Sequence, residues 1–300
     1  MESILGQQWK IRLAHGLIAS LISSALTLVW NPPSIAMPSD PAPSYTTHAG
    51  VGALFHVHAG FSTYTGEHLS IDFMLDRPDR HQTVAHGTAA SEIQALKHQC
   101  QAAPSCGQQA FDRKLADYYR SRQLRLETGP VRRLLVDVPA VVRQQHKQLR
   151  PAARAIRAVA QHKGKDRDWA VDAAIAMVQT SLRYQRPPRM ENGRDTLGFL
   201  PPLSALERGY GDCDTKSALL AALILNIKPG RIIGLQLPNH YLLGIERHPR
   251  TGQASIRYQG RDFVLVEASG PAMRAPGQIS PQSRKGLLRK DRVQIHHIRI

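Results

Sequence analysis

The chain has 300 residues, of which 42% are hydrophobic and 6% aromatic, and its formal net charge is +16. The hydrophobic fraction is enough for a buried core, in one domain with an extension or in two small domains. Few aromatic residues and the lack of a nucleic-acid motif argue against a nucleic-acid partner. The positive charge fits either a solvated basic surface or attraction to an anionic membrane or wall polymer.

The first 36 residues have the layout of an export signal. Lys10 and Arg12 are followed by an uncharged apolar run at 16–30 and by Ser34-Ile35-Ala36, which resembles a cleavage site. The run is shorter than the roughly 20 residues that cross a membrane, although residues 13–30 could also stay as an uncleaved anchor. We therefore expect an exported protein of the periplasm or cell envelope.

If the protein is exported, two of its three cysteines can form a disulfide. Cys100 and Cys106 lie in a polar segment with five residues between them, which suits a local disulfide in an oxidising compartment. Cys213 is then left as the free thiol. The alternative is that all three cysteines are reduced and buried.

The first half of the chain predicts a linker, strands and helices in that order. We expect a polar linker at 37–50, strands within 51–85 (one at 68–75), and helices at 107–127, 140–149, 151–163 and 167–183. The last helix has apolar residues at helical spacing, and Asp166 or Asp168 can cap it. We assign 37–165 to an N-terminal extension of unknown role.

The second half predicts a helix packed on an antiparallel sheet. A long connection at 185–209 leads to a helix from Cys213 to about Asn226, which is apolar on every side and so must be buried. Strands are expected at 231–237, 240–247, 254–259 and 262–267, with a final edge strand at 293–300. The fold class is α+β, and 166–300 is the expected catalytic domain.

The position of Cys213 predicts a reactive thiol. A helix start offers unpaired N–H groups and a partial positive charge, which favour a thiolate and an oxyanion beside it. Gly211 lets the chain turn into the helix, and Asp212 or Thr215 can help to cap it. Asp212 and Asp214 would oppose the thiolate if they pointed inward, so we expect them to point outward or to cap the helix.

A histidine and an acid follow on predicted strands. His240 opens a strand and is the expected base, whereas His248 on the next turn is the weaker candidate. Asp262 and Glu267 lie five residues apart and face opposite sides of their strand. Glu267 is the better orienting acid, because a carboxylate at the end of a buried run needs a partner. Each of these residues alone could equally be structural.

These segments resemble the transglutaminase-like superfamily of thiol enzymes. The similarity covers about 167–275 and rests on Gly211-Asp212-Cys213-Asp214-Thr215-Lys216-Ser217, the helix segment 178–184, the strand His240–Ile245 and Val266-Glu267-Ala268-Ser269. It implies a papain-like core with Cys213 as nucleophile, His240 as general base and acid, and Glu267 as orienter. The family usually carries Asp followed by Pro where this chain has Glu267 and Ala268.

The resemblance implies an exported thiol-dependent peptidase or amidase that acts on a protein or peptide through a thioester. Two alternatives remain open: an acyl transferase to amines, and a basic module that binds an anionic envelope polymer without turnover. No cofactor is expected. His56 and His58 share a strand face and could form half of a metal site, but no acid or cysteine is near them in sequence, so no metal is expected. The sequence leaves the oligomeric state open.

Overall fold

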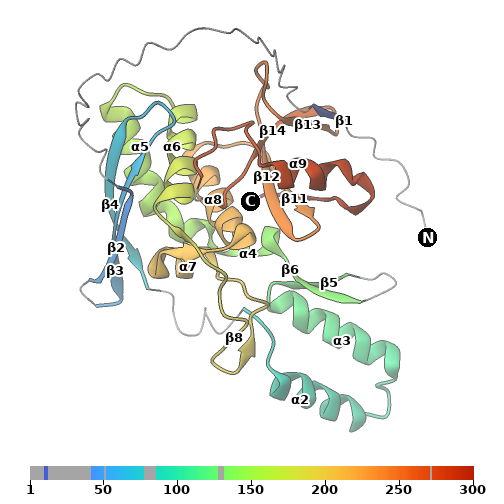
Figure 1. The fold of residues 1–300 in the computed structure, drawn as a ribbon. Coiled ribbons are helices and arrows are strands. Elements are labelled where there is room, and N and C mark those ends of the chain that lie inside the picture. The colour runs from blue at the N-terminus through green and yellow to red at the C-terminus, as the bar shows by residue number, and fades with distance from the viewer. Residues whose placement is uncertain (1–9, 13–41, 51, 78–85, 128–131, 271) are drawn as a thin grey trace, which may run out of the picture.

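A computed structural model describes residues 10–12, 42–50, 52–77, 86–127, 132–270 and 272–300. It confirms a mixed α+β architecture with a large antiparallel sheet (Figure 1). Most of the proposed export signal and part of the linker lie outside the described residues. Within the described segments, no helix has both the length and the apolar character needed to cross a membrane.

The large sheet has six antiparallel strands in the order β1-β13-β14-β12-β11-β15. They span β1 Lys10–Arg12, β11 Ile232–Leu237, β12 His240–Glu246, β13 Ser255–Tyr258, β14 Arg261–Val266 and β15 Gln294–Ile298. The four predicted central strands and the predicted edge strand at the C-terminus are confirmed. The basic residues Lys10 and Arg12 form the other edge by pairing with β13.

One buried helix, α8 (Cys213–Ile227), occupies the centre of the molecule (Figure 1). One side of α8 contacts β12 of the large sheet. The other side contacts four helices: α4 (Val138–Gln145), α5 (Arg150–His162), α6 (Arg167–Thr180) and α7 (Pro202–Arg208). A helix that is apolar all round is stable only in such surroundings. The prediction of a buried helix starting at Cys213 is confirmed.

A second, three-stranded sheet covers the helices on the side away from the large sheet (Figure 1). It consists of β2 (Ser44–Ala49), β3 (Leu54–Ser62) and β4 (His68–Asp76), and its apolar face packs on α5 and α6. One continuous hydrophobic core therefore runs from Phe55 to Ile298, across the boundary expected near residue 165.

The remaining elements form a helical arm and the connections. The arm contains α2 (Ala90–Gln101) and α3 (Gln108–Ser121), joined by the predicted disulfide between Cys100 and Cys106. Shorter elements are β5 (Leu124–Glu127), β6 (Arg133–Val136), η1 (His146–Leu149), β7 (Arg183–Tyr184), β8 (Met190–Glu191), β9 (Arg194–Asp195), β10 (Tyr210–Gly211), α9 (Pro281–Leu288) and η2 (Lys290–Arg292).

Three expectations about local structure are wrong. In the described part of the linker expected at 37–50, Ser44–Ala49 forms β2 and pairs with β3. The helix expected at 107–127 ends at Ser121, because Gln123 has a positive φ of 59° that breaks the helix, and β5 follows it. The connection at 185–209 is not a plain loop, since it contains the hairpin β8–β9 and helix α7. Asp166 does cap α6 as predicted, by accepting a hydrogen bond from the Trp169 N–H.

Candidate active site

Cys213 is the first residue of α8, and its side chain is half-buried. The backbone N–H groups of Tyr241 and Asp214 hydrogen-bond to the thiol sulfur and favour its ionised form. Gly211 makes the turn possible by its small size, because a Cβ there would lie 2.3 Å from the Thr215 side chain. The N-terminus of the helix and the strand carrying His240 therefore meet at the cysteine.

The expected low pKa of this thiol is wrong. Burial and, after it, the negative charges of Asp214 and Asp212 raise the pKa of Cys213 to about 12, against the effect of the two backbone N–H groups. The lowering of the thiol pKa by the helix start is thus smaller than the rise caused by desolvation and by nearby negative charge. At neutral pH the thiol of the resting protein carries its proton.

The expectation that Asp212 and Asp214 point outward or cap α8 is met only in part, since the negative charges of both act on the thiol and raise its pKa. Asp212 makes no side-chain capping bond, whereas Asp214 accepts a hydrogen bond from the Thr215 N–H. Burial raises the pKa of Asp214 well above its ordinary value, and the hydrogen bond and negative charge of Asp212 raise it further. Two close carboxyl groups of this kind share one proton.

The acidic pair provides a test of what controls the thiol. We expect Asp212→Asn/Asp214→Asn to lower the pKa of Cys213 by about one unit, so that alkylation near neutral pH is about tenfold faster. Each single substitution leaves one charged carboxylate and should have a smaller effect. The measurement is the rate of iodoacetamide labelling against pH.

The control for that measurement is Asp291→Asn, an exposed acid on η2. This variant should label at the wild-type rate at every pH. Equal rates for the double variant and the wild type would show that burial alone sets the thiol pKa.

The predicted histidine and acid do come together. Nε2 of His240 lies 3.1 Å from Oε1 of Glu267, and both side chains are largely buried. The strand register brings them together. Leu243 of β12 pairs with Val266 of β14, and Glu267 follows Val266 directly. Since an ionised carboxylate only accepts hydrogen bonds, Nε2 carries the proton and Nδ1 is left as the basic nitrogen.

Glu267 is held ionised by several donors that the sequence did not predict. Its carboxylate accepts hydrogen bonds from the Ser280 N–H (2.7 Å), the Ser280 hydroxyl (2.8 Å) and the Ser283 hydroxyl (2.8 Å), and Arg274 lies 3.5 Å away. Burial raises the pKa of Glu267, but the hydrogen bonds from His240, Ser280 and Ser283 outweigh it and bring the pKa to about 2. The carboxylate is therefore charged over the whole physiological range.

The thiol and the imidazole approach the end of the sheet from opposite faces. Tyr241 belongs to the core on the α8 side of β12, and Leu242 belongs to the core on the other side. Side chains alternate along a strand, so His240 shares the face of Leu242. Among the contacts of the described residues, Cys213 and His240 are not hydrogen-bonded to each other. The Cys213 sulfur instead contacts the backbone N–H of Tyr241, the residue after His240.

A buried lysine, for which the sequence contains no motif, links α8 to the loop that carries Glu267. Lys216 is 0% exposed, and its Nζ donates to the carbonyl oxygens of Gln179 (3.3 Å), Leu182 (2.9 Å) and Ser269 (3.0 Å). Ser269 lies two residues after Glu267. Burial lowers the pKa of Lys216 to about 7. The signal was a lysine inside an otherwise apolar helix, since buried lysines are rare unless paired.

Gln179 completes this link. Its side-chain amide donates to the backbone carbonyls of Glu267 (2.6 Å) and Arg274 (3.0 Å) and accepts from the Arg274 N–H (2.9 Å). Gly270 has φ +57°, and a Cβ there would lie 2.1 Å from the Gln179 carbonyl oxygen. The loop that carries Glu267 is therefore fixed to α6 and α8 by buried polar contacts.

The other candidate residues lie apart from this site. His248 lies two residues beyond Glu246, the far end of β12, and that end is about 20 Å from His240 at the rise of a strand. Asp262 pairs with Arg257 at 3.3 Å. His56 and His58 both contact Asp72, which β4 brings beside them at 3.3 and 3.0 Å. No group of three potential ligands positioned for a metal ion is found among the described residues.

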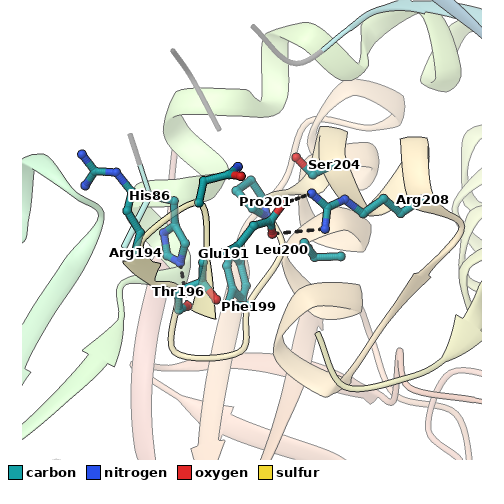
Figure 2. A pocket seen from close by; sticks show the side chains of 10 residues that line it. His86, Glu191, Arg194, Thr196, Phe199, Leu200, Pro201, Ser204 and Arg208 are labelled. Carbon is teal, nitrogen blue, oxygen red and sulfur yellow. Dashed lines mark hydrogen bonds and ion pairs between the residues drawn. The ribbon is translucent and has the colours of Figure 1, made fainter. Parts of the chain in front are cut away.

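A small cavity lies between His86, α7 and the β8–β9 hairpin (Figure 2). Its volume is about 20 Å³, which is enough for one water molecule. The Ser204 hydroxyl is buried there with no partner among the described residues, while Glu191 and Arg208 pair with each other. The polar cavity thus suits a bridging water, and Cys213, His240 and Glu267 do not line it.

Comparison of the chain with protein-family models, with curated proteins and with solved structures found no match.

Proposed function

We propose that the chain is a thiol-dependent amide hydrolase with a transglutaminase-like, papain-like core. The observation that carries this proposal is the buried His240–Glu267 pair at the start of β12, whose next residue, Tyr241, contacts through its N–H the single free cysteine at the start of the buried helix α8. Glu267 fixes the imidazole, and the sulfur contacts the N–H of the residue after His240. Cys213 is the proposed nucleophile, His240 the general base and acid, and Glu267 the orienting group.

The first half of the reaction forms a thioester. The Cys213 sulfur attacks the amide carbonyl carbon while its proton passes to Nδ1 of His240. The imidazolium then gives this proton to the amide nitrogen as the carbon–nitrogen bond breaks, and the amine leaves. In the second half, water attacks the thioester carbon, its proton passes through His240 to the sulfur, and the free acid leaves.

The raised thiol pKa decides the order of events. A preformed thiolate is scarce at neutral pH, so the proton must leave the sulfur as the new bond forms. This transfer needs Nδ1 of His240 within hydrogen-bonding reach of the sulfur, and such contacts are often long in unliganded enzymes and tighten with substrate. The N–H groups of Tyr241 and of the first turn of α8 supply donors for the developing oxyanion.

The proposed substrate is a protein or peptide amide, and the proposed location is the cell envelope. The Cys100–Cys106 disulfide supports an oxidising compartment, because disulfides persist outside the reducing cytosol. It also leaves Cys213 as the one free thiol, so thiol-specific labelling of the folded protein reports on Cys213.

The deciding experiment is acyl transfer to Cys213 from p-nitrophenyl acetate. We expect a burst of one nitrophenolate per chain, an acetyl mass increase on the intact protein, and slow release of acetate. Cys213→Ala should lose the burst entirely. His240→Ala should slow the burst by about 10²- to 10⁴-fold, the range of general-base catalysis.

Product analysis separates this proposal from its alternatives. Adding a labelled amine should leave free acid as the product, whereas incorporation of the amine would identify an acyl transferase. Equal acylation of the wild type and His240→Ala, at the rate of a free cysteine, would contradict an activated thiol. A binding module without turnover would then be the better description.

A further inference from the structure

A basic groove lies where α5 ends and α6 begins, in the chain between the two helices. Its volume is about 660 Å³, within the range of small-ligand sites. Four cationic side chains line it: Arg154, Arg157, Lys165 and Arg167. The rest of the lining consists of small residues such as Ala158, Gly164 and Ala170, together with Gln161 and one carboxylate, Asp166.

The positive charge of this region is largely uncompensated. From Val138 to Arg167 the chain has eight lysines and arginines and one acidic residue, Asp166. Lys163 pairs with Glu67, and the Asp166 carboxylate accepts from the Trp169 N–H. Among the described residues, none of the four groove cations has a carboxylate partner.

Arg157 gives the groove a more specific feature than its charge. The side chain is half-buried, and its Nε is enclosed and has no hydrogen-bond partner in the described part of the chain. Buried donors are nearly always paired with protein, water or a ligand. Arg154 lies three residues earlier, on the same side of α5. Two guanidinium groups therefore line one groove, and the enclosed Nε of Arg157 holds one of them in place beside it.

We propose that this groove binds the phosphate group of a small phosphorylated molecule such as a sugar phosphate. Guanidinium groups present paired N–H donors that match phosphate oxygens, and charge-assisted bonds of this kind are strong. A groove of this volume can take up an individual molecule, so a small phosphorylated compound is the occupant proposed. The lining has no aromatic residue on which a nucleic-acid base could stack.

This site is separate from the candidate active site and does not depend on the proposed function. The groove lies at the first turn of α6, whereas Lys216 contacts the last turn of the same helix. At the rise of an α-helix these turns are about 18 Å apart.

The test is titration calorimetry of the full chain with glucose 6-phosphate at low ionic strength. We expect saturable one-to-one binding that inorganic phosphate competes with. Arg154→Gln/Arg157→Gln should weaken binding by at least about tenfold, since it removes both guanidinium groups. The matched control, Arg113→Gln/Lys114→Gln on α3, removes the same charge from an exposed surface and should bind as the wild type does.

Three results would overturn the proposal. The first is no saturable binding of glucose 6-phosphate. The second is equal weakening by the groove variant and the α3 control, which would show attraction to net charge alone. The third is binding of phosphatidylglycerol vesicles, with the same dependence on Arg154 and Arg157, in the absence of glucose 6-phosphate binding. Circular dichroism of both variants establishes that they are folded.

Discussion

Lys216→Ala is expected to lower the free energy of unfolding by about 3 to 5 kcal/mol at pH 8, as measured by urea denaturation. The substitution leaves a cavity in the core and removes the donor for three buried carbonyl oxygens. Lys216→Met fills the same space, so it should cost only about 1 to 3 kcal/mol, from the unpaired carbonyls. The difference between the two variants separates packing from hydrogen bonding.

The pH dependence of stability provides a sharper test of Lys216. Its pKa is about 7 in the folded chain against 10.5 for an exposed lysine. Below pH 7 both states carry the proton, and the full cost of burying the charge is present. Between pH 7 and 10.5 only the unfolded chain keeps the proton. The free energy of unfolding therefore rises with pH, by up to about 1.4 kcal/mol per unit.

Comparison with Lys216→Met isolates this contribution from other titrating groups. The wild type should gain stability relative to the variant as pH rises from 7 to 10. Three carbonyl oxygens match the three N–H donors of an ammonium group and oppose the effect of burial. If the difference in free energy of unfolding between the wild type and Lys216→Met stays constant over this range, these contacts keep Lys216 charged in the folded chain. That result would contradict the lowered pKa of Lys216.

The sequence predicted the elements whose patterns are strong. The apolar run after Cys213 could only be a buried helix, and the strands from 231 to 267 have turn residues between them, so their register brings His240 to Glu267. Cys100 and Cys106 were predicted from spacing and compartment. In each case, short-range pattern and long-range packing require the same structure.

Contacts between distant segments could not be predicted in this way. Ser280 and Ser283 reach Glu267 from α9, and Asp72 reaches His56 and His58 from the next strand, although neither set shows a spacing motif. The thiol pKa was mispredicted for a related reason. The helix start is visible in the sequence, but the depth of burial and the direction of Asp212 and Asp214 depend on the whole fold.

Glu267→Gln is expected to reduce the rate of Cys213 acylation by about 10³- to 10⁴-fold, the cost of a misoriented histidine in a triad. The neutral amide cannot hold the His240 imidazolium that forms during the reaction. The amide of Gln also has an N–H₂ group, which is a donor, where Ser280 and Ser283 need an acceptor. The measurement is the p-nitrophenyl acetate burst from pH 5 to 9. The matched control is Asp262→Asn, the other acid of this strand, which should react at the wild-type rate.

Acid unfolding shows whether the same contacts also stabilise the fold. The pKa of Glu267 is about 2 in the folded chain, below its ordinary value of 4.5, so its stabilising effect is complete above pH 4.5 and is lost as pH falls toward 2. The wild type should lose about 3 kcal/mol over that range through this group, and Glu267→Gln should not. A variant that loses this acid dependence but keeps the wild-type burst would make Glu267 a structural residue and remove it from the proposed triad. A variant that loses both assigns Glu267 a stabilising and an orienting role, because the same hydrogen bonds hold the carboxylate charged and fix the imidazole.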